Sequence, residues 1–257
     1  MVSRLRLRRS REPKIKMKVI SLVPSWTETL LECGVEVIGR TRYCIHPTND
    51  VKIVGGTKDW NFELIRSLNP DFILLDQEEN KKEMFEAWPE KCVITHVERV
   101  EHLSSHLDLL ARTFENQKLQ DLALRWQFIS DKKITARSLK DIPGILRWMN
   151  PPSEDCDRLL YIIWKNPWMA VNQDTFISSM LRHLGLGDKL SQHEKKYYEF
   201  ELKDLSTNCL LLFSSEPYPF LKHSEAIGKM NFASAIIDGE FYSWFGMRSL
   251  KFLEEFK

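Results

Sequence analysis

The sequence predicts an α/β protein made of two lobes that a helical segment joins. Three observations support this fold class. Short apolar runs alternate with helical patterns in the first 100 residues, residues 99–138 contain neither glycine nor proline, and the alternation resumes in the last third of the chain. Because strands that alternate with helices form a parallel sheet with helices on its faces, each lobe is expected to contain such a sheet.

The N-terminal lobe is expected over residues 17–98. A short buried strand at residues 18–23 precedes a helix that begins at Pro24, where Ser25 and Glu28 have the spacing of a capping box. The remaining elements follow as an apolar run, a helix, a strand, a helix and a strand, at residues 35–38, 62–68, 71–76, 79–88 and 92–95.

Residues 99–140 are expected to form a helical spine between the lobes. Their apolar positions, from Val100 to Ile129, recur at mixed spacings of three and four, as one or two long amphipathic helices require. The sequence DIPG at residues 141–144 then interrupts the pattern. The C-terminal lobe, residues 141–257, continues with a strand, a helix and two strands, at residues 158–163, 174–184, 209–213 and 234–238.

The composition describes a globular protein and excludes an integral membrane protein. Hydrophobic residues make up 43% and charged residues 28% of the 257 residues. No apolar run approaches the roughly 18 to 20 residues of a membrane-spanning helix. Residues 1–16 carry a charge of +6 and the remaining body carries −5. Such a basic segment could contact nucleic acid or an anionic membrane, but we expect a disordered leader, or a start at Met17, and no nucleic-acid partner.

The cysteines and the N-terminal sequence indicate the compartment. Five scattered cysteines without a C-x-x-C pair suit a reducing environment better than a disulfide framework. Only the five apolar residues VISLV follow the basic segment before Pro24, fewer than the roughly 7 to 15 of a secretory signal. The sequence as written predicts a cytoplasmic protein, and a periplasmic one if the start is wrong.

The stretch TRYCIHP, residues 41–47, places a cation, a phenol, a thiol and an imidazole in one loop. Cys44 and His46 could coordinate a metal, or act as a nucleophile and its base. The loop could also form the lip of a pocket, or be purely structural. C-x-H alone is weak against the usual zinc spacings, and no acid is evident to orient the imidazole.

Tryptophans gather in the loops that follow predicted strands. In open α/β sheets, ligands bind at the carboxyl ends of the strands, and tryptophans next to proline, asparagine or glycine at those ends suit a large flat ligand. Packing between the lobes is the alternative explanation for Trp60, Trp164, Trp168 and Trp244. The glutamates of these loops, Glu216 and Glu240, are expected to be solvated or to line the cleft. The usual catalytic signatures, such as H-E-x-x-H, G-x-S-x-G and the P-loop, do not occur.

Several stretches resemble the substrate-binding proteins of ABC importers for cobalamin and iron complexes, the helical-backbone metal-receptor class with a periplasmic-binding-protein-like fold. The resemblance runs from about Lys18 to about Leu250 and is carried by ISLVPS, GRTRYCIHP, VGGTK, LNPDFIL and WMAV, at residues 20–25, 39–47, 54–58, 68–74 and 168–171. It implies two Rossmann-like lobes, a long rigid helix between them and a ligand in the cleft. It also implies an ABC permease as a partner, although the chain shows neither an export signal nor a lipid-anchor cysteine.

We therefore expect a monomeric, non-enzymatic protein that binds a large metal-containing small molecule, a cobalamin-like corrinoid or an iron chelate, and has no intrinsic cofactor. His46 could ligate a metal within the bound chelate. The expected ligand-binding residues are Ser25, Trp26, Tyr43, His46, Trp60, Trp164, Trp168, Tyr218, Trp244 and Arg248. Two alternatives stay open: an enzyme that uses Cys44, His46 or Glu216 as acid-base groups, and an interaction protein whose cleft holds no ligand.

Overall fold

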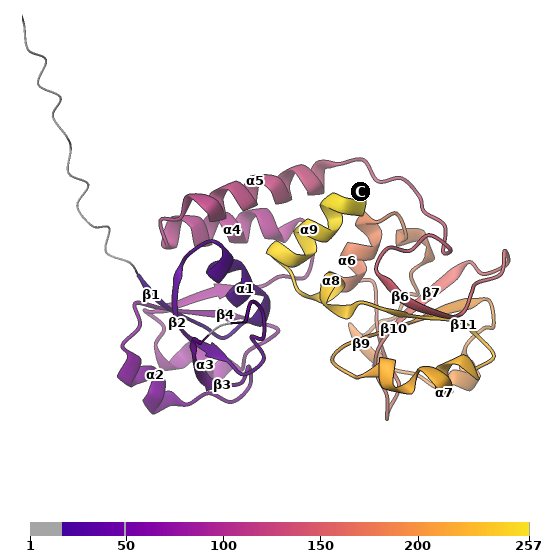
Figure 1. Cartoon of the computed structure of the whole chain (residues 1–257), viewed down its shortest axis with the longest axis horizontal. Coiled ribbons are helices and arrows are strands. Elements are labelled where there is room, and N and C mark those ends of the chain that lie inside the picture. Colours follow the sequence, from indigo (N-terminus) through magenta and orange to yellow (C-terminus); the bar gives the residue numbers. More distant parts are fainter. Residues whose placement is uncertain (1–16, 49, 257) are drawn as a thin grey trace, which may run out of the picture.

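The chain folds into two α/β lobes that lie side by side (Figure 1). The computed structural model describes residues 17–48 and 50–256, so the prediction for the basic segment 1–16 lies outside the described residues. The predicted fold class is confirmed. Within the described residues, the helices are too short and too polar to cross a bilayer.

The N-terminal lobe contains a fully parallel five-stranded sheet in the order β3-β2-β1-β4-β5. Its central strands are short apolar runs buried on both faces, as parallel sheets require. The elements of this lobe are β1 (Lys18–Ser21), α1 (Pro24–Glu32), β2 (Glu36–Thr41), β3 (Lys52–Gly55), α2 (Phe62–Leu68), β4 (Phe72–Asp76), α3 (Lys82–Ala87) and β5 (Cys92–Thr95).

The capping box predicted for α1 is wrong. The N-cap is Val23, which makes no side-chain hydrogen bond to the helix, and Pro24 occupies the first helical turn, where its missing N–H is tolerated. Glu28 does not reach back to the helix start, because its carboxylate binds Arg248 from the C-terminal end of the chain.

The helical spine is a hairpin and not one long helix. Helices α4 (His102–Thr113) and α5 (Gln117–Asp131) are separated by a tight turn. Glu115 has a left-handed backbone (φ 45°), and the side chain of Asn116 caps α5 by accepting a hydrogen bond from the Leu119 N–H. These two residues end the first helix and start the second. Residues 132–144 then cross to the C-terminal lobe without helix or strand.

The C-terminal lobe contains a six-stranded sheet in the order β6-β11-β10-β7-β8-β9. The predicted parallel arrangement holds for its centre, where β7, β10 and β11 are parallel, but β6, β8 and β9 are antiparallel, so the sheet is mixed. The elements of this lobe are β6 (Ile145–Asn150), β7 (Arg158–Trp164), β8 (Met169–Val171), α6 (Phe176–His183), η1 (Gly187–Lys189), β9 (Tyr197–Glu199), η2 (Leu202–Asp204), β10 (Cys209–Ser214), η3 (Phe220–His223), α7 (Ser224–Gly228) and β11 (Ala233–Ile237).

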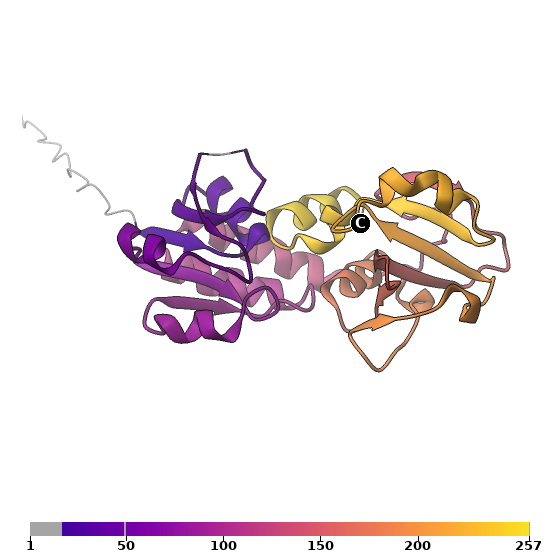
Figure 2. The same ribbon diagram turned by 90° about the horizontal axis from the view of Figure 1, so that it is seen from below.

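The last two helices connect the lobes. Helices α8 (Gly239–Ser243) and α9 (Met247–Phe256) follow β11, and α9 packs on α1 and α5 of the other half of the molecule (Figures 1 and 2). Trp126 of α5 donates a hydrogen bond to the Gly246 carbonyl at 3.1 Å. Gly246 has φ 94°, and a Cβ there would lie 2.3 Å from Thr29 Oγ1, so this close approach requires glycine.

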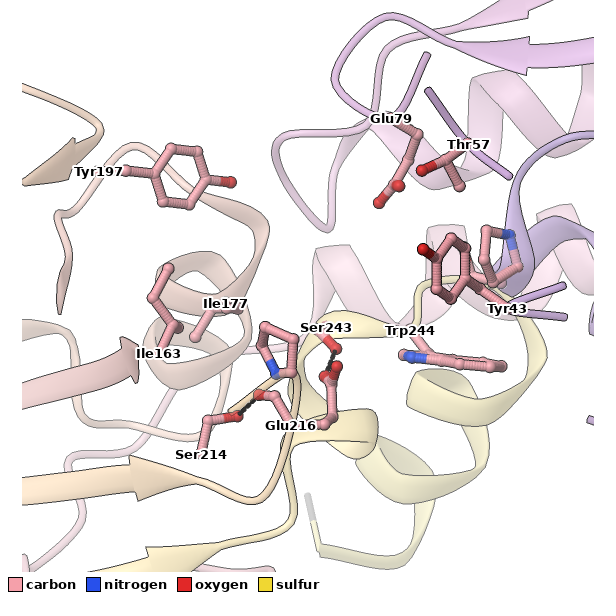
Figure 3. A pocket seen from close by; sticks show the side chains of 13 residues that line it. Tyr43, Thr57, Glu79, Ile163, Ile177, Tyr197, Ser214, Glu216, Ser243 and Trp244 are labelled. Carbon is pink, nitrogen blue, oxygen red and sulfur yellow. Dashed lines mark hydrogen bonds between the residues drawn. The ribbon is translucent and has the colours of Figure 1, made fainter. Parts of the chain in front are cut away.

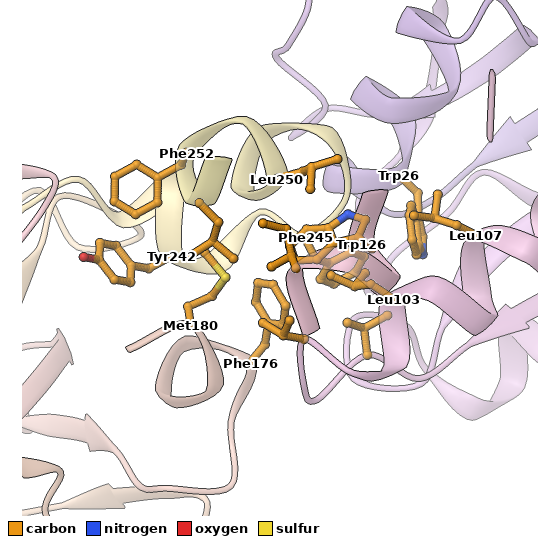
Figure 4. Close-up of a cluster of buried hydrophobic side chains, with 14 of the residues drawn as sticks. Trp26, Leu103, Leu107, Trp126, Phe176, Met180, Tyr242, Phe245, Leu250 and Phe252 are labelled. Atoms are coloured by element: carbon orange, nitrogen blue, oxygen red, sulfur yellow. The ribbon is translucent and has the colours of Figure 1, made fainter. Parts of the chain in front are cut away.

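One continuous hydrophobic core runs through both halves. Its buried side chains come from α1, α4 and α5 on one side and from α6, α8 and α9 on the other, as Figure 4 shows for part of the cluster. Apolar area that both lobes bury together resists separation of the lobes. The lobes are therefore held in place by packing in addition to the connecting helices.

Candidate functional site

A cavity of about 440 Å³ lies between the two lobes (Figure 3). Most of its lining comes from loops at the carboxyl ends of strands in both sheets, the position where open α/β sheets bind ligands. The residues that line it are Pro24, Ser25, Tyr43, Thr57, Glu79, Ile163, Ile177, Tyr197, Ser214, Glu216, Pro217, Ser243 and Trp244.

Two carboxyl groups give the cavity its polar character. Glu79 comes from the loop after β4, and Glu216 from the loop after β10, so the lobes contribute one each. Burial raises the pKa of Glu216, although the hydrogen bond that Ser243 Oγ donates to it at 2.6 Å opposes the shift. Burial, and then the charge of Asp76, raises the pKa of Glu79. Among the residues that line this cavity, none is a lysine or arginine.

At one rim, side chains of the C-terminal lobe bind acids of the N-terminal lobe. Lys196 contacts the carboxylates of Glu78 and Glu98, the second at 2.7 Å, and Tyr197 donates to Glu78 at 3.2 Å. His96 lies 3.0 Å from Glu98, which makes Glu78, His96 and Glu98 a group with the donor types of a metal site. The Lys196 ammonium already pairs with both carboxylates, so this group acts as a polar contact between the lobes.

At another edge of the cavity, α9 is tied to α1 and to the TRYCIHP loop. Arg248 makes a two-point ion pair with Glu28, at 2.7 and 3.0 Å, and a further contact with Glu240 at 3.0 Å. His46 lies 3.1 Å from Glu240 and packs edge-on against Trp244. The Arg248 guanidinium lies 5.4 Å from the centre of the Trp244 ring. These contacts fix the orientation of Trp244 at the cavity wall.

The structure places three predicted site residues on the cavity wall. Ser25, Tyr43 and Trp244 line it directly. His46 and Arg248 lie beside it and engage Glu240 instead of facing the cavity. Of the two loop glutamates, Glu216 lines the cavity and Glu240 is held in these ion pairs.

The remaining predicted residues lie elsewhere. Trp26 is fully buried in the core, where its indole N–H donates to Thr95. Trp60 packs in the N-terminal lobe against Phe62 and Trp88. Trp168 stacks on Phe220 in the core of the C-terminal lobe.

Trp164 and Tyr218 pack on each other outside the cavity, and Trp164 is 40% exposed. Side chains alternate between the faces of a strand. In β7, therefore, Ile163 faces the cavity and Trp164 does not.

Sequence reasoning did not select several cavity residues. Thr57 belongs to the VGGTK stretch and Glu79 begins a predicted helix, but nothing in the sequence showed that their side chains converge with that of Ser214. Ile163, Ile177, Tyr197 and Ser243 carried no signal of their own. The alternation of side chains along a strand could have indicated that Ile163 points to the opposite side from Trp164.

Cys44 is a buried structural thiol. Its side chain is fully inaccessible, and the sulfur lies 3.1 Å from the hydroxyls of Thr27 and of Thr41. Burial raises the thiol pKa above its ordinary value. Because the thiolate is the nucleophile and the metal ligand, the burial and raised pKa of Cys44 disfavour both chemistries.

This environment predicts slow modification of Cys44. In native protein at neutral pH, iodoacetamide should label the partly exposed Cys156 first and leave Cys44 unmodified, as followed by peptide mass spectrometry. Labelling of Cys44 should rise only above the ordinary thiol pKa, because the raised pKa keeps it protonated at lower pH. Rapid labelling of Cys44 at neutral pH would contradict the buried geometry.

Solved structures of two-lobed binding proteins share this architecture. The periplasmic vitamin B12 binding protein BtuF of Vibrio cholerae is 16% identical over 93% of this chain and 94% of its own, with a TM-score of 0.67. The periplasmic heme-binding protein BhuT, in complex with two hemes, is 17% identical over 93% and 96%, with a TM-score of 0.70. The siderophore-binding protein FhuD of Vibrio cholerae, bound to Fe³⁺–Desferal, is 19% identical over 94% and 96%, with a TM-score of 0.63.

The chain thus has the fold of the class III periplasmic binding proteins, and the resemblance found in the sequence is confirmed for the fold. No model of a protein family and no curated protein matches the sequence.

Proposed function

We propose that this chain is a non-enzymatic binding protein that holds a metal-containing small molecule, a corrinoid or an iron chelate, in the cavity between its lobes. The observation that carries the proposal is the cavity wall itself. Both lobes contribute to it, the aromatic rings of Tyr43 and Trp244 line it, and hydroxyl and carboxyl groups complete it (Figure 3). Aromatic walls with a few polar groups suit a large amphipathic ligand.

The side chains that an enzyme would need do not support the competing proposal. Cys44 is buried and protonated, and His46 is engaged with Glu240. Of the three acid-base candidates from the sequence, Glu216 lines the cavity, where Glu79 supplies a second carboxyl group. Two carboxyl groups without a cysteine nucleophile or a histidine among the residues that line this cavity are better explained as ligand contacts.

Solved structures with this fold are named for vitamin B12, heme and a ferric siderophore, which supports a ligand of this size and kind. We include in the proposal that the chain would deliver its ligand to an ABC permease. Glu240 is a poor candidate for contacting that permease, because Arg248 and His46 already hold its carboxylate.

Equilibrium dialysis of the purified protein against vitamin B12, the Fe³⁺–Desferal complex and hemin tests the proposal. At least one of these should bind saturably with one ligand per chain, and its visible absorption bands should stay with the protein. Failure of all three to bind, or chemical conversion of any of them, would contradict the proposed binding function.

A further inference from the structure

If the chain binds a ligand as proposed, the carboxyl groups of the cavity restrict the chemical class of that ligand. We propose that Glu79 and Glu216 form an acid pair that selects ligands whose periphery donates hydrogen bonds or carries positive charge, and rejects ligands whose periphery carries carboxylates. The two side chains come from opposite lobes and both line the cavity, as Figure 3 shows.

The carboxylate of Glu79 can accept hydrogen bonds from a ligand. Within the described residues its carboxylate has neither a hydrogen-bond partner nor an ion-pair partner, although it is only partly exposed. The neighbouring cation does not serve it, since Lys58 donates to the main-chain carbonyl of Glu78 at 2.8 Å. A sheltered carboxylate without a partner is unfavourable, so a ligand that donates to it gains affinity.

Glu216 is held in place and still has an oxygen available. Ser243 donates to Oε1 at 2.6 Å, and Ser214 donates to the Glu216 main-chain carbonyl. These bonds fix the side chain on the wall of the C-terminal lobe. Its second carboxylate oxygen has no described partner and can accept a hydrogen bond from a ligand.

The charges around the pair reinforce the selection. Asp76 lies near Glu79, while Asp238 and Glu240 lie near Glu216. The charge of Lys58 opposes the rise in the pKa of Glu79, and Arg248 is committed to Glu28 and Glu240. Within the described residues, a ligand carboxylate would therefore enter a site where acids outnumber cations and only Lys58 opposes them, which disfavours its ionised form.

Three probes separate the possible sources of this chemistry. The Fe³⁺–Desferal complex carries a pendant ammonium group, vitamin B12 carries amide N–H groups, and hemin carries two carboxylates. We expect wild-type protein to bind the Desferal complex or vitamin B12 at least about ten-fold more tightly than hemin. Which of the two binds more tightly tells whether charge or hydrogen bonding dominates.

The variants Glu79→Gln and Glu216→Gln keep the side-chain shape and remove the charge. Each should weaken binding of the preferred ligand by about ten- to a hundred-fold. In the double variant, the ratio of the affinity for that ligand to the affinity for hemin should be smaller than in wild-type protein. Glu194→Gln, an exposed change in the C-terminal lobe, should alter neither quantity. For the Desferal complex, affinity should also fall toward mildly acidic pH, because protonation of the two carboxyl groups removes the charge that attracts the ammonium.

The outcomes distinguish this inference from the proposed function. Tighter binding of hemin than of both other probes, or an unchanged preference in the double variant, would overturn the acid-pair inference and leave the binding function intact. The hemin comparison uses wild-type protein and does not depend on a variant that folds. Binding of none of the three probes would overturn both.

Discussion

Replacing Arg248 with alanine is expected to destabilise the protein by about 3 to 5 kcal/mol, because it leaves the Glu28 carboxylate without its partner in a sheltered site. Glu28 is 7% exposed, and Arg248 makes two hydrogen bonds to it. The same change removes one of the contacts of Glu240. Urea unfolding followed by circular dichroism measures the loss as a lower midpoint.

Arg125→Ala is the matched control. Arg125 also makes a two-point ion pair, with Glu254, but both side chains are well exposed. Surface pairs of this kind contribute at most about 1 kcal/mol. Equal, small losses in the two variants would show that the α1–α9 ion pair does not hold the halves of the molecule together.

Replacing Trp26 with alanine is expected to cost about 3 to 5 kcal/mol of stability, because a fully buried indole leaves a cavity that the surrounding core cannot fill. Trp26 packs edge-on against Phe245 at 5.0 Å and donates to Thr95 at 2.9 Å. Its removal should reduce the unfolding midpoint while the folded fraction keeps its ligand affinity.

Trp26→Phe separates the hydrogen bond from the packing. It keeps an aromatic ring and removes only the indole N–H and part of the volume, so its loss should be smaller. Thr95 keeps its own bonds to Leu75 and Asp76. A Trp26→Ala protein with unchanged stability and abolished ligand binding would contradict this prediction and would identify Trp26 as a ligand-binding residue.

The sequence predicted the buried strands best. β1, β4, β7, β10 and β11 appear near their expected places, because strands that are largely buried on both faces read as continuous apolar runs, and the edge strand β5 was also found from its apolar run. The edge strand β6, with the sequence ILRWMN, is partly exposed and was not recognised. Helix α9 was also not predicted, although its leucines at positions 250 and 253 have helical spacing and lie buried. The place where α9 packs depends on tertiary contacts that no local pattern contains.

The candidate site was predicted in position but not in detail. The rule that ligands bind at the carboxyl ends of strands led to loops that line the cavity. It could not tell which side chains of a loop face the cavity, as the contrast between Tyr43 on the wall and Cys44 in the core shows. Nor could it show that Trp168 turns back onto the core of its own lobe. Those orientations follow from side-chain packing across distant segments.

The most direct test of the binding account is an isotherm for Trp244→Ala beside one for Trp164→Ala, each titrated with the probe that wild-type protein binds. Trp244 lines the cavity, whereas Trp164 is an exposed tryptophan outside it. Loss of the cavity ring should weaken binding by about ten- to a hundred-fold, and loss of the outer ring should leave affinity unchanged. Equal affinities for the two variants, or a larger loss in Trp164→Ala, would contradict the placement of the ligand between the lobes.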